Sequence, residues 1–268
     1  MKIAAVQMVS TPDVTRNLDA AAALVARAAG EGAELVVLPE YFCVLGRSDR
    51  DKLALAEAPG SGPIQSRLAQ AARTHGIWLV GGTLPMTIAG TTERVTNTNL
   101  VFSPAGEQVA RYDKMHLFRY DNGREKYDEG RTLNPGSEVV SFAAGSWRVG
   151  LSVCYDLRFP ELYRTLMQPP CDLLCVPSAF THPTGAAHWE VLLRARAIEN
   201  QCYVIAAAQG GLHENGRRTF GHSLIVDPWG EVVALRRDDG EGVVLAELDA
   251  VRIASVRAQL PALAHRRL

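Results

Sequence analysis

SWRVGLSVCYDLRFPELYRTLM, residues 146–167, contains an apolar run, a short polar segment and a helix-like segment. Residues 146–154 predict a buried strand that ends at Cys154. Residues 159–167 carry proline at their second position, where a helix tolerates it, and predict a helix. The next run, CDLLCVPSAF at 171–180, predicts another strand. Strands that alternate with helices in this way are typical of an α/β fold.

The same alternation extends over the rest of the chain. Further strands are predicted at 3–9, 33–39, 77–85, 202–209 and 242–249, and further helices at 15–29, 60–76 and 186–201. Hairpins are predicted at 96–112, turning at SPAG, and at 222–235, turning at DPWG. Strand–helix units mixed with hairpins indicate mixed sheets covered by helices. Because no linker or low-complexity tract interrupts the pattern, we expect one domain over residues 1–268.

Composition excludes several classes of protein. The chain has 268 residues, enough to bury an apolar core without disulfides or a structural metal. It carries 28 Lys and Arg against 29 Asp and Glu without a basic stripe, so a nucleic acid partner is not expected. No apolar stretch is long enough to span a bilayer, and the start MKIAAVQMVSTPD is typical of a strand, not of a targeting segment. We expect a soluble, cytoplasmic protein with no membrane partner.

The cysteines stand at positions 43, 154, 171, 175 and 202. An odd number without CxxC spacing argues against a disulfide framework and against a zinc site. Cys171 and Cys175 fall within one predicted strand, where cysteine commonly serves as a small apolar side chain. The sequence has neither a full dinucleotide fingerprint nor a Walker sequence. We therefore expect no metal and no cofactor.

Cys154 differs from the other cysteines because it stands at the carboxyl end of a predicted strand. Side chains in such places point into the crevice where α/β proteins bind ligands. A helix is predicted nearby, and the dipole at a helix N-terminus lowers the pKa of a thiol. A buried structural cysteine is the alternative, and the neighbouring polar residues Tyr155, Asp156 and Arg158 strengthen the interpretation as a nucleophile.

Two charged residues occupy similar places. Glu40 follows the strand predicted at 33–39, and a carboxylate against apolar walls tends to have a raised pKa, which suits a general base. Lys114 follows the hairpin at 96–112, and an ammonium near a thiol can stabilise both a thiolate and an oxyanion. Taken singly, Glu40 is better interpreted as a solvated loop glutamate and Lys114 as a surface lysine.

A cysteine–histidine pair, as in papain-like proteases, is a second arrangement that the sequence allows. The candidate histidines are His116, His182, His188 and His222. The local signatures of those proteases are absent, and a single histidine is more often a packed or solvated residue. The charged pair Glu40 and Lys114 is therefore the preferred hypothesis.

Together these segments resemble the nitrilase or carbon–nitrogen hydrolase superfamily. LPE at 38–40, DKMHLF at 113–118 and SVCYDLRFPELYR at 152–164 are similar to its three catalytic segments and stand in the same order. The likeness covers essentially the whole chain. It implies a four-layer α-β-β-α sandwich with two mixed β-sheets, and it implies a homodimer.

The resemblance also implies roles for individual residues. Glu40, Lys114 and Cys154 correspond to the catalytic triad of the superfamily. In that mechanism the thiol attacks an amide to form a thioester, the glutamate transfers protons, and the lysine stabilises the oxyanion together with the backbone N–H of Tyr155. A second glutamate that orients the lysine or positions the substrate corresponds to Glu129, in YDEGRTLNPG.

Segments 178–211, 221–234 and 260–267 are similar to the Nit branch of the superfamily, which implies an amide of an α-keto acid as the small-molecule substrate. Arg158 is the candidate clamp for the keto-acid carboxylate, and Phe180 and Thr184 are expected to line the pocket.

Several alternatives stay open at this point. Arg158 can instead form a structural ion pair with Asp156 or Glu161. The amide can join 2-oxoglutarate to cysteinylglycine or to ammonia, and an aliphatic amidase or carbamoylase has the same triad. A catalytically silent binding or scaffolding relative is a further alternative. The charged loop at 119–131 leaves the specificity open.

Overall fold

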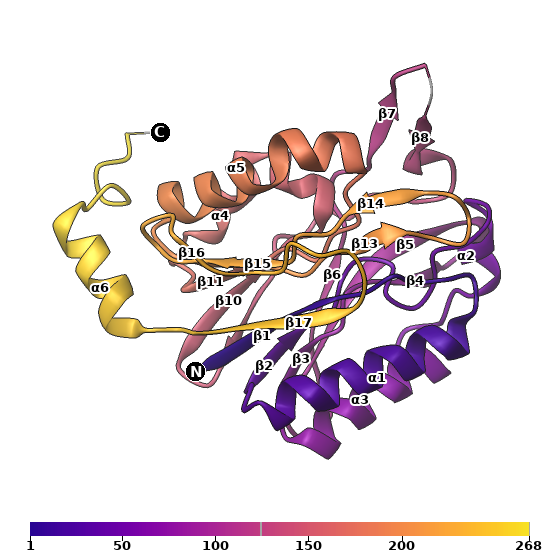
Figure 1. The fold of residues 1–268 in the computed structure, drawn as a ribbon, viewed down its shortest axis with the longest axis horizontal. Coiled ribbons are helices and arrows are strands. Elements are labelled where there is room, and N and C mark those ends of the chain that lie inside the picture. Colours follow the sequence, from indigo (N-terminus) through magenta and orange to yellow (C-terminus); the bar gives the residue numbers. More distant parts are fainter. Residues whose placement is uncertain (124, 268) are drawn as a thin grey trace.

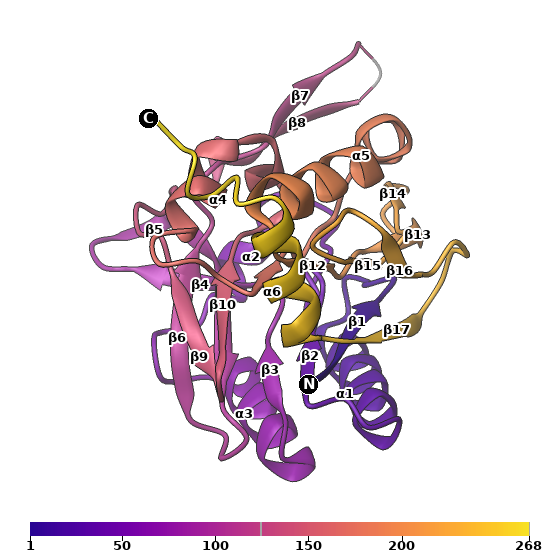
Figure 2. The same cartoon turned by 90° about the vertical axis from the view of Figure 1, so that its left-hand side faces the viewer.

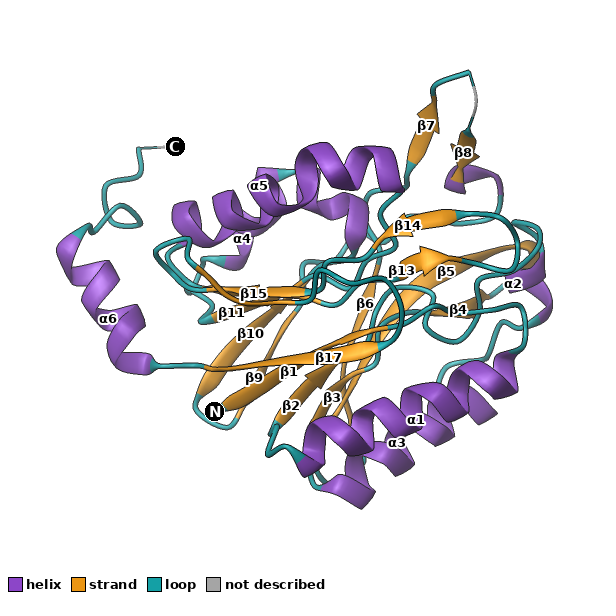
Figure 3. Ribbon diagram, viewed as in Figure 1, coloured by secondary structure: helices purple, strands orange, loops and turns teal. Residues whose placement is uncertain are grey.

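In the described part of the chain, two mixed β-sheets lie face to face between two layers of helices (Figures 1 and 3). The structure is a computed structural model that describes residues 1–123 and 125–267. Arg124, which belongs to the charged loop, and Leu268 lie outside the described residues. The four-layer α-β-β-α sandwich predicted from the sequence is confirmed.

The first sheet has its helices on one face and the second sheet on the other. Its strands are β1 (Lys2–Gln7), β2 (Leu35–Val37), β3 (Trp78–Val80), β4 (Leu84–Ile88), β5 (Thr91–Phe102), β6 (Gln108–Asp113) and β17 (Gly242–Glu247). Their order is β17-β1-β2-β3-β5-β4, with β6 paired to β5. Strands β1, β2 and β3 are parallel and the remaining pairs are antiparallel, so the sheet is mixed.

The second sheet repeats this plan. Its strands are β9 (Ser141–Ala144), β10 (Trp147–Leu151), β11 (Leu173–Cys175), β12 (Tyr203–Ala206), β15 (Leu224–Val226) and β16 (Val232–Leu235). Their order is β16-β15-β12-β11-β10-β9, and only the pairs β10–β11 and β11–β12 are parallel among these described strands. Parallel strands therefore lie at the centre of each sheet, where both faces are buried.

Helices cover the two outer faces (Figure 3). On the first sheet lie α1 (Val14–Gly30) and α3 (Pro63–His75), and on the second lie α4 (Pro160–Leu166) and α5 (His182–Asn200). Strand β1 shows how sequence builds these layers. Because side chains alternate along a strand, Ile3 and Ala5 pack into the core between the sheets, whereas Ala4 and Val6 pack against the helices.

The remaining elements lie outside the two sheets. They are α2 (Asp51–Ala54), β7 (Arg119–Asp121), β8 (Lys126–Asp128), the 3-10 turns η1 (Glu129–Arg131) and η2 (Cys154–Arg158), β13 (Gly210–Leu212), β14 (Arg218–Phe220) and α6 (Ala250–Gln259). The β7–β8 hairpin projects away from the body of the protein (Figure 2). In residues 1–123 and 125–267, no helix is both long and apolar enough to cross a membrane.

The predicted elements are confirmed, except that two have different bounds and that the structure adds α2, β9 and the β7–β8 and β13–β14 hairpins. The strand predicted at 77–85 is two strands, because Gly82, with φ +61°, turns the chain between β3 and β4. A Cβ atom there would lie 2.2 Å from the Pro39 carbonyl oxygen, so the turn requires glycine. Helix α5 begins at His182, four residues earlier than predicted, with proline in its first turn. The β7–β8 hairpin, within the charged loop, was not predicted.

Candidate active site

The candidate active site gathers segments that follow strands of both sheets. Glu40 lies three residues after β2, and Cys154 lies three residues after β10. Lys114 follows β6 directly, and Ala179 follows β11. The N–H of Ala179 donates to Glu40 Oε2 at 3.0 Å, which joins the two sheets at this point. The structure therefore brings together the three residues that the sequence placed at strand ends.

Cys154 has a left-handed backbone, with φ +50°. This conformation costs a non-glycine residue about 1–3 kcal/mol and persists only where neighbours impose it. The Cys154 N–H donates to the Pro177 carbonyl at 2.9 Å, and the Val153 N–H donates to Asp156 Oδ2 at 2.8 Å. These contacts hold a sharp turn from strand to 3-10 helix, a geometry that presents a nucleophile in other hydrolases.

Lys114 is enclosed between two carboxylates. Its Nζ donates to Glu40 Oε1 at 2.8 Å and to the two oxygens of Glu129 at 3.0 and 2.8 Å. The side chain of Lys114 is 0% exposed and that of Glu40 is 1% exposed, so the interpretations as surface residues are wrong. Burial lowers the pKa of Lys114, but the charges of Glu129 and Glu40 outweigh it and raise the pKa. Lys114 is therefore a cation throughout the physiological pH range.

Glu129 completes this group as the sequence resemblance implied. Besides Lys114, it accepts hydrogen bonds from the Tyr41 hydroxyl and the Phe118 N–H, each at 2.7 Å. Burial acts to raise the pKa of Glu129, yet the charge and hydrogen bond of Lys114 lower it overall. Asn97 Nδ2 donates to Glu40 Oε1 at 2.9 Å, so both carboxylates have donors on each oxygen.

The charges of Glu40, Lys114 and Glu129 affect the pKa of the Cys154 thiol. Burial first, and the negative charge of Glu40 second, raise the pKa of Cys154 well above its usual value, while Lys114 acts in the opposite direction. The lowered thiol pKa expected from the sequence is wrong, because burial dominates and α4 begins only at Pro160. The thiol is therefore protonated at neutral pH and needs a base to react.

Asp156 ties the cysteine turn to the segment that carries Lys114. Its carboxylate accepts from the Tyr112 hydroxyl at 2.7 Å and from the His116 N–H at 3.0 Å, in addition to Val153. His116 Nδ1 lies 2.7 Å from Asp156 Oδ1, and the His116 ring stacks on Phe159. In the sequence Asp156 is recognisable only as part of a polar cluster, because two of its partners, His116 and Tyr112, are 40 and 44 positions away.

The predicted substrate-binding residues line one small cavity with Glu40 and Cys154. Its wall includes Tyr155, Arg158, Phe180 and Thr184. The cavity volume is about 10 Å³, which is room for about one water. An acyl group can bind only if side chains move.

Arg158 forms no ion pair with Asp156 or Glu161, so the alternative interpretation of this residue is wrong. Its Nη1 lies 3.3 Å from His188 Nδ1, and its guanidinium lies 5.4 Å from the centre of the Phe180 ring. None of the ion pairs between described residues includes Arg158, which leaves its charge available to an anion.

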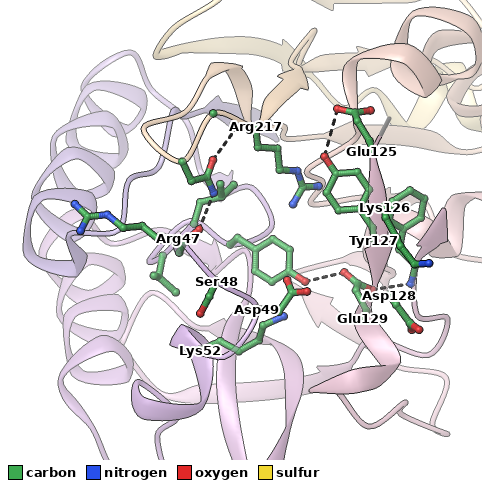
Figure 4. Close-up of a pocket in the computed structure, with 17 residues that line it drawn as sticks. Arg47, Ser48, Asp49, Lys52, Glu125, Lys126, Tyr127, Asp128, Glu129 and Arg217 are labelled. Atoms are coloured by element: carbon green, nitrogen blue, oxygen red, sulfur yellow. Dashed lines mark hydrogen bonds between the residues drawn. The ribbon is translucent and has the colours of Figure 1, made fainter. Parts of the chain in front are cut away.

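A larger vestibule of about 550 Å³ opens beside this cavity (Figure 4). The two share Phe118, Glu129 and Arg217. The vestibule wall also includes Tyr41 and the hairpin residues 125–128, so part of the charged loop belongs to the site. Sequence reasoning missed Arg217 and Lys52 as site residues, since neither stands at the end of a predicted strand.

The histidines do not form a pair with Cys154 in the described part of the chain. His116 contacts Asp156, His188 contacts Arg158, and His222 stacks on Phe220. Between residues 1 and 267, leaving aside position 124, no three His, Cys, Asp or Glu side chains are grouped as metal ligands would be.

Comparisons with known proteins agree with this geometry. The family model described as carbon-nitrogen hydrolase matches residues 2–258. A relative from Synechocystis sp. (strain PCC 6803 / GT-S), described as deaminated glutathione amidase, is 43% identical over 268 residues. That match covers 98% of this chain and 97% of the relative.

Solved structures are similar over the same length. Nit3 of Saccharomyces cerevisiae, a member of branch 10 of the nitrilase superfamily, superposes with a TM-score of 0.90 at 34% identity, covering 100% of this chain and 97% of that chain. A mutant amidase from Nesterenkonia sp. AN1 superposes with a TM-score of 0.81 at 30% identity, covering 97% of this chain and 98% of that chain. That structure shows the result of Michael addition of acrylamide at the active site cysteine.

Proposed function

The chain belongs to the carbon–nitrogen hydrolase family, whose enzymes hydrolyse carbon–nitrogen bonds, and on this premise we propose that it acts as a deaminated glutathione amidase. The reaction is hydrolysis of the amide between 2-oxoglutarate and cysteinylglycine. The observation that carries the proposal is the buried group Glu40–Lys114–Glu129 beside the Cys154 thiol. The relative from Synechocystis supports the choice of substrate.

In the proposed acylation step, Cys154 attacks the amide carbonyl carbon. Because the thiol is protonated at rest, Glu40 takes its proton as the carbon–sulfur bond forms. Lys114 and the backbone N–H of Tyr155 stabilise the oxyanion of the tetrahedral intermediate. Glu40 then returns the proton to the amide nitrogen, the carbon–nitrogen bond breaks, and the amine leaves a thioester on Cys154.

In the proposed deacylation step, water attacks the thioester. Glu40 accepts one proton from that water, the carbon–oxygen bond forms, and the carbon–sulfur bond breaks. The proton returns to the Cys154 sulfur, which restores the resting thiol and releases the keto acid. Glu129 holds Lys114 in place throughout, because its two oxygens contact Nζ at 3.0 and 2.8 Å.

The keto-acid carboxylate of the substrate is assigned to Arg158, with Phe180 and Thr184 lining the same cavity. Thr184 Oγ1 lies 2.8 Å from Thr181 Oγ1 and can rotate its hydroxyl toward a keto or carboxylate oxygen. A carboxylate on Arg158 would supply the ion pair that this guanidinium does not form with any described residue.

The test compares two substrates and two variants. We expect the wild-type protein to release 2-oxoglutarate from deaminated glutathione faster than it releases ammonia from 2-oxoglutaramate. Cys154→Ala should abolish turnover with an unchanged circular dichroism spectrum, because Cys154 is the only cysteine among the described residues that line the cavity. Cys175→Ala, a buried cysteine on β11, is the matched control and should retain activity.

Three outcomes would change the assignment. A preference for 2-oxoglutaramate would move it to an omega-amidase. Full turnover in Cys154→Ala, or no covalent mass adduct on Cys154 with a thiol-directed amide analogue, would exclude the mechanism.

A homodimer, a cytoplasmic location and a single domain over residues 1–268 stay predictions. Exposed apolar side chains on the outer face of α5 offer a candidate dimer surface, since Val191 is 68% and Ile198 is 48% exposed.

A further inference from the structure

The cavity at Cys154 and the vestibule divide the space around the reacting amide. The cavity holds Arg158, Phe180 and Thr184, which the proposed function assigns to the acyl group. An amide has a second substituent, on its nitrogen, and this must leave by another direction. The vestibule adjoins the cavity at Phe118, Glu129 and Arg217, and its volume of about 550 Å³ far exceeds the space that ammonia needs.

Arg217 stands at this junction with its guanidinium fixed in place. Its Nη2 donates to the Ala179 carbonyl at 2.9 Å, and the group lies 4.8 Å from the centre of the Tyr127 ring. Ala179 is the residue whose N–H contacts Glu40, so Arg217 is held next to the proposed base. Its Nε is buried and has no hydrogen-bond acceptor in the described part of the chain. Arg217 also forms no ion pair with a described carboxylate, which leaves a positioned cation without an anion.

Lys52, on α2, is a second cation in the vestibule. Its Nζ lies 5.7 Å from the centre of the Tyr41 ring, and none of the carboxylates in residues 1–123 and 125–267 pairs with it. Burial lowers the pKa of Lys52, although the charge of Glu129 acts to raise it. Figure 4 shows Lys52 and Arg217 reaching into the vestibule from opposite sides, whereas Arg47 points away from it.

The vestibule also contains acidic side chains, whose negative charge is complementary to the positive charge of a released, protonated amine. Asp49, Glu125 and Asp128 line it. Glu125 Oε2 is buried and lacks a hydrogen-bond donor among the described residues. When the amide is cleaved, the leaving nitrogen becomes an amine that is protonated at neutral pH. A leaving group that carries both an ammonium and a carboxylate therefore fits a wall with charges of both signs.

We propose that the vestibule is the subsite for the leaving amine and that Arg217, assisted by Lys52, binds a carboxylate carried by that amine. The preferred leaving groups are then amino acids or short peptides with a free carboxyl terminus, not ammonia. This assignment rests on the proposed function only in taking the acyl group to occupy the cavity at Cys154.

The first experiment uses two substrates that differ in one carboxylate, namely deaminated glutathione and the same molecule with its glycine carboxyl amidated. We expect the amidated substrate to have a KM about 10- to 100-fold higher in the wild-type protein, the worth of one charge-assisted contact. In Arg217→Gln this ratio should shrink to about 1, whatever the effect on overall turnover. Lys52→Met should reduce the ratio by a smaller factor.

Arg218→Gln is the matched control, because Arg218 is the next residue in the chain and its partner is Asp239, outside the vestibule. This variant should keep the wild-type ratio. If Arg217→Gln keeps the full ratio, or if Arg218→Gln loses it as well, the assignment of Arg217 is wrong.

The second experiment separates this proposal from the identity of the acyl group. Calorimetry would measure binding of glycylglycine and of glycylglycine amide to Cys154→Ala, which cannot turn over. We expect the free carboxylate to bind at least tenfold more tightly, and Arg217→Gln in the same background to remove the difference. Equal binding of the two peptides overturns the subsite whichever acyl group the enzyme accepts. A clear difference in a protein that does not cleave α-keto-acid amides would retain the subsite and refute only the proposed function.

Discussion

The cavity at Cys154 and the vestibule beside it share a wall but differ in how their charges are satisfied. At the cavity, each carboxylate oxygen of Glu40 and Glu129 accepts at least one hydrogen bond from the protein, and so does each oxygen of Asp156 in the turn behind Cys154. By contrast, Arg217 Nε, on the wall that the two share, and Glu125 Oε2, in the vestibule, are buried without a partner among the described residues. The two regions therefore have different roles. A hydrogen-bonded network in which every group has a partner fixes the positions of the reacting side chains, whereas buried donors and acceptors without a partner are available to bind a ligand.

This difference predicts two kinds of mutational effect. A change inside the cavity should affect every substrate equally, since it disturbs a network in which each group positions the next. A change in the vestibule should affect only substrates whose leaving group reaches it. The selectivity expected for Arg217→Gln is an effect of the second kind, whereas changes at Glu40 and Asp156 are of the first kind.

The largest effect is expected from Glu40→Gln. The amide cannot accept the Cys154 proton, and in either orientation its NH2 group would face a donor, the Ala179 N–H or Lys114 Nζ. We expect kcat to fall about 1,000-fold, as is typical for loss of a general base, on deaminated glutathione and on 2-oxoglutaramate alike. Steady-state kinetics on both substrates measure this. Glu107→Gln, at an exposed position in the β5–β6 turn, is the control. A fall in kcat on only one of the two substrates would contradict these different roles of the cavity and the vestibule.

Asp156→Asn should destabilise the protein as well as slow it. Asp156 is fully buried and accepts hydrogen bonds from Tyr112, His116 and Val153. The NH2 group of an asparagine would face one of these donors and break its hydrogen bond. We expect the free energy of unfolding to fall by about 3 kcal/mol, measured by urea denaturation. Because Asp156 acts through the positions of Cys154 and Lys114, kcat should fall with little change in KM. A change in KM alone would argue against a positioning role.

Much of the cavity could be predicted from the sequence, because its residues follow strands. Glu40, Lys114 and Cys154 each stand just beyond an apolar strand or hairpin, and the carboxyl ends of central strands converge. The family resemblance supplied their order and added Glu129. The fold followed from the same alternation. Its errors fall where one glycine turns a strand, where one proline starts a helix early, and at short elements such as β7 and β8 that no periodic pattern marks.

The vestibule could not be predicted in this way, because its residues come from loops without a periodic pattern. Lys52 lies on a one-turn helix, and Arg217 lies in the turn between β13 and β14. Only tertiary contacts bring them to the site, such as the hydrogen bond from Arg217 to Ala179, which are 38 positions apart. Asp156 was visible in the sequence but its function was not, since its partners lie on a distant segment.

The smallest predicted effect concerns the turn that carries Arg217 and depends on pH. His213 is buried, its N–H donates to the Arg217 carbonyl at 2.9 Å, and its ring nitrogens lie 2.8 Å from the Ser10 carbonyl and from Thr219 Oγ1. Burial lowers the pKa of His213 to about 4, against the backbone contact with Ser10, which acts to raise it. The folded protein thus keeps this ring neutral, whereas the unfolded chain protonates it near pH 6.5.

The sign of the pH dependence follows from that difference. Since the folded pKa is the lower one, the stabilisation is complete above about pH 6.5 and is lost as the pH falls from there toward 4. We expect His213 to lower the free energy of unfolding by about 2 kcal/mol at pH 5 relative to pH 8, measured by urea denaturation at each pH. His213→Gln should lack this part of the decline, whereas His75→Gln, at an exposed position on α3, should retain it. If the free energy of unfolding declined identically in both variants, His213 would not be protonated on unfolding. A neutral His213 would then make no contribution to the stability of the turn that holds Arg217.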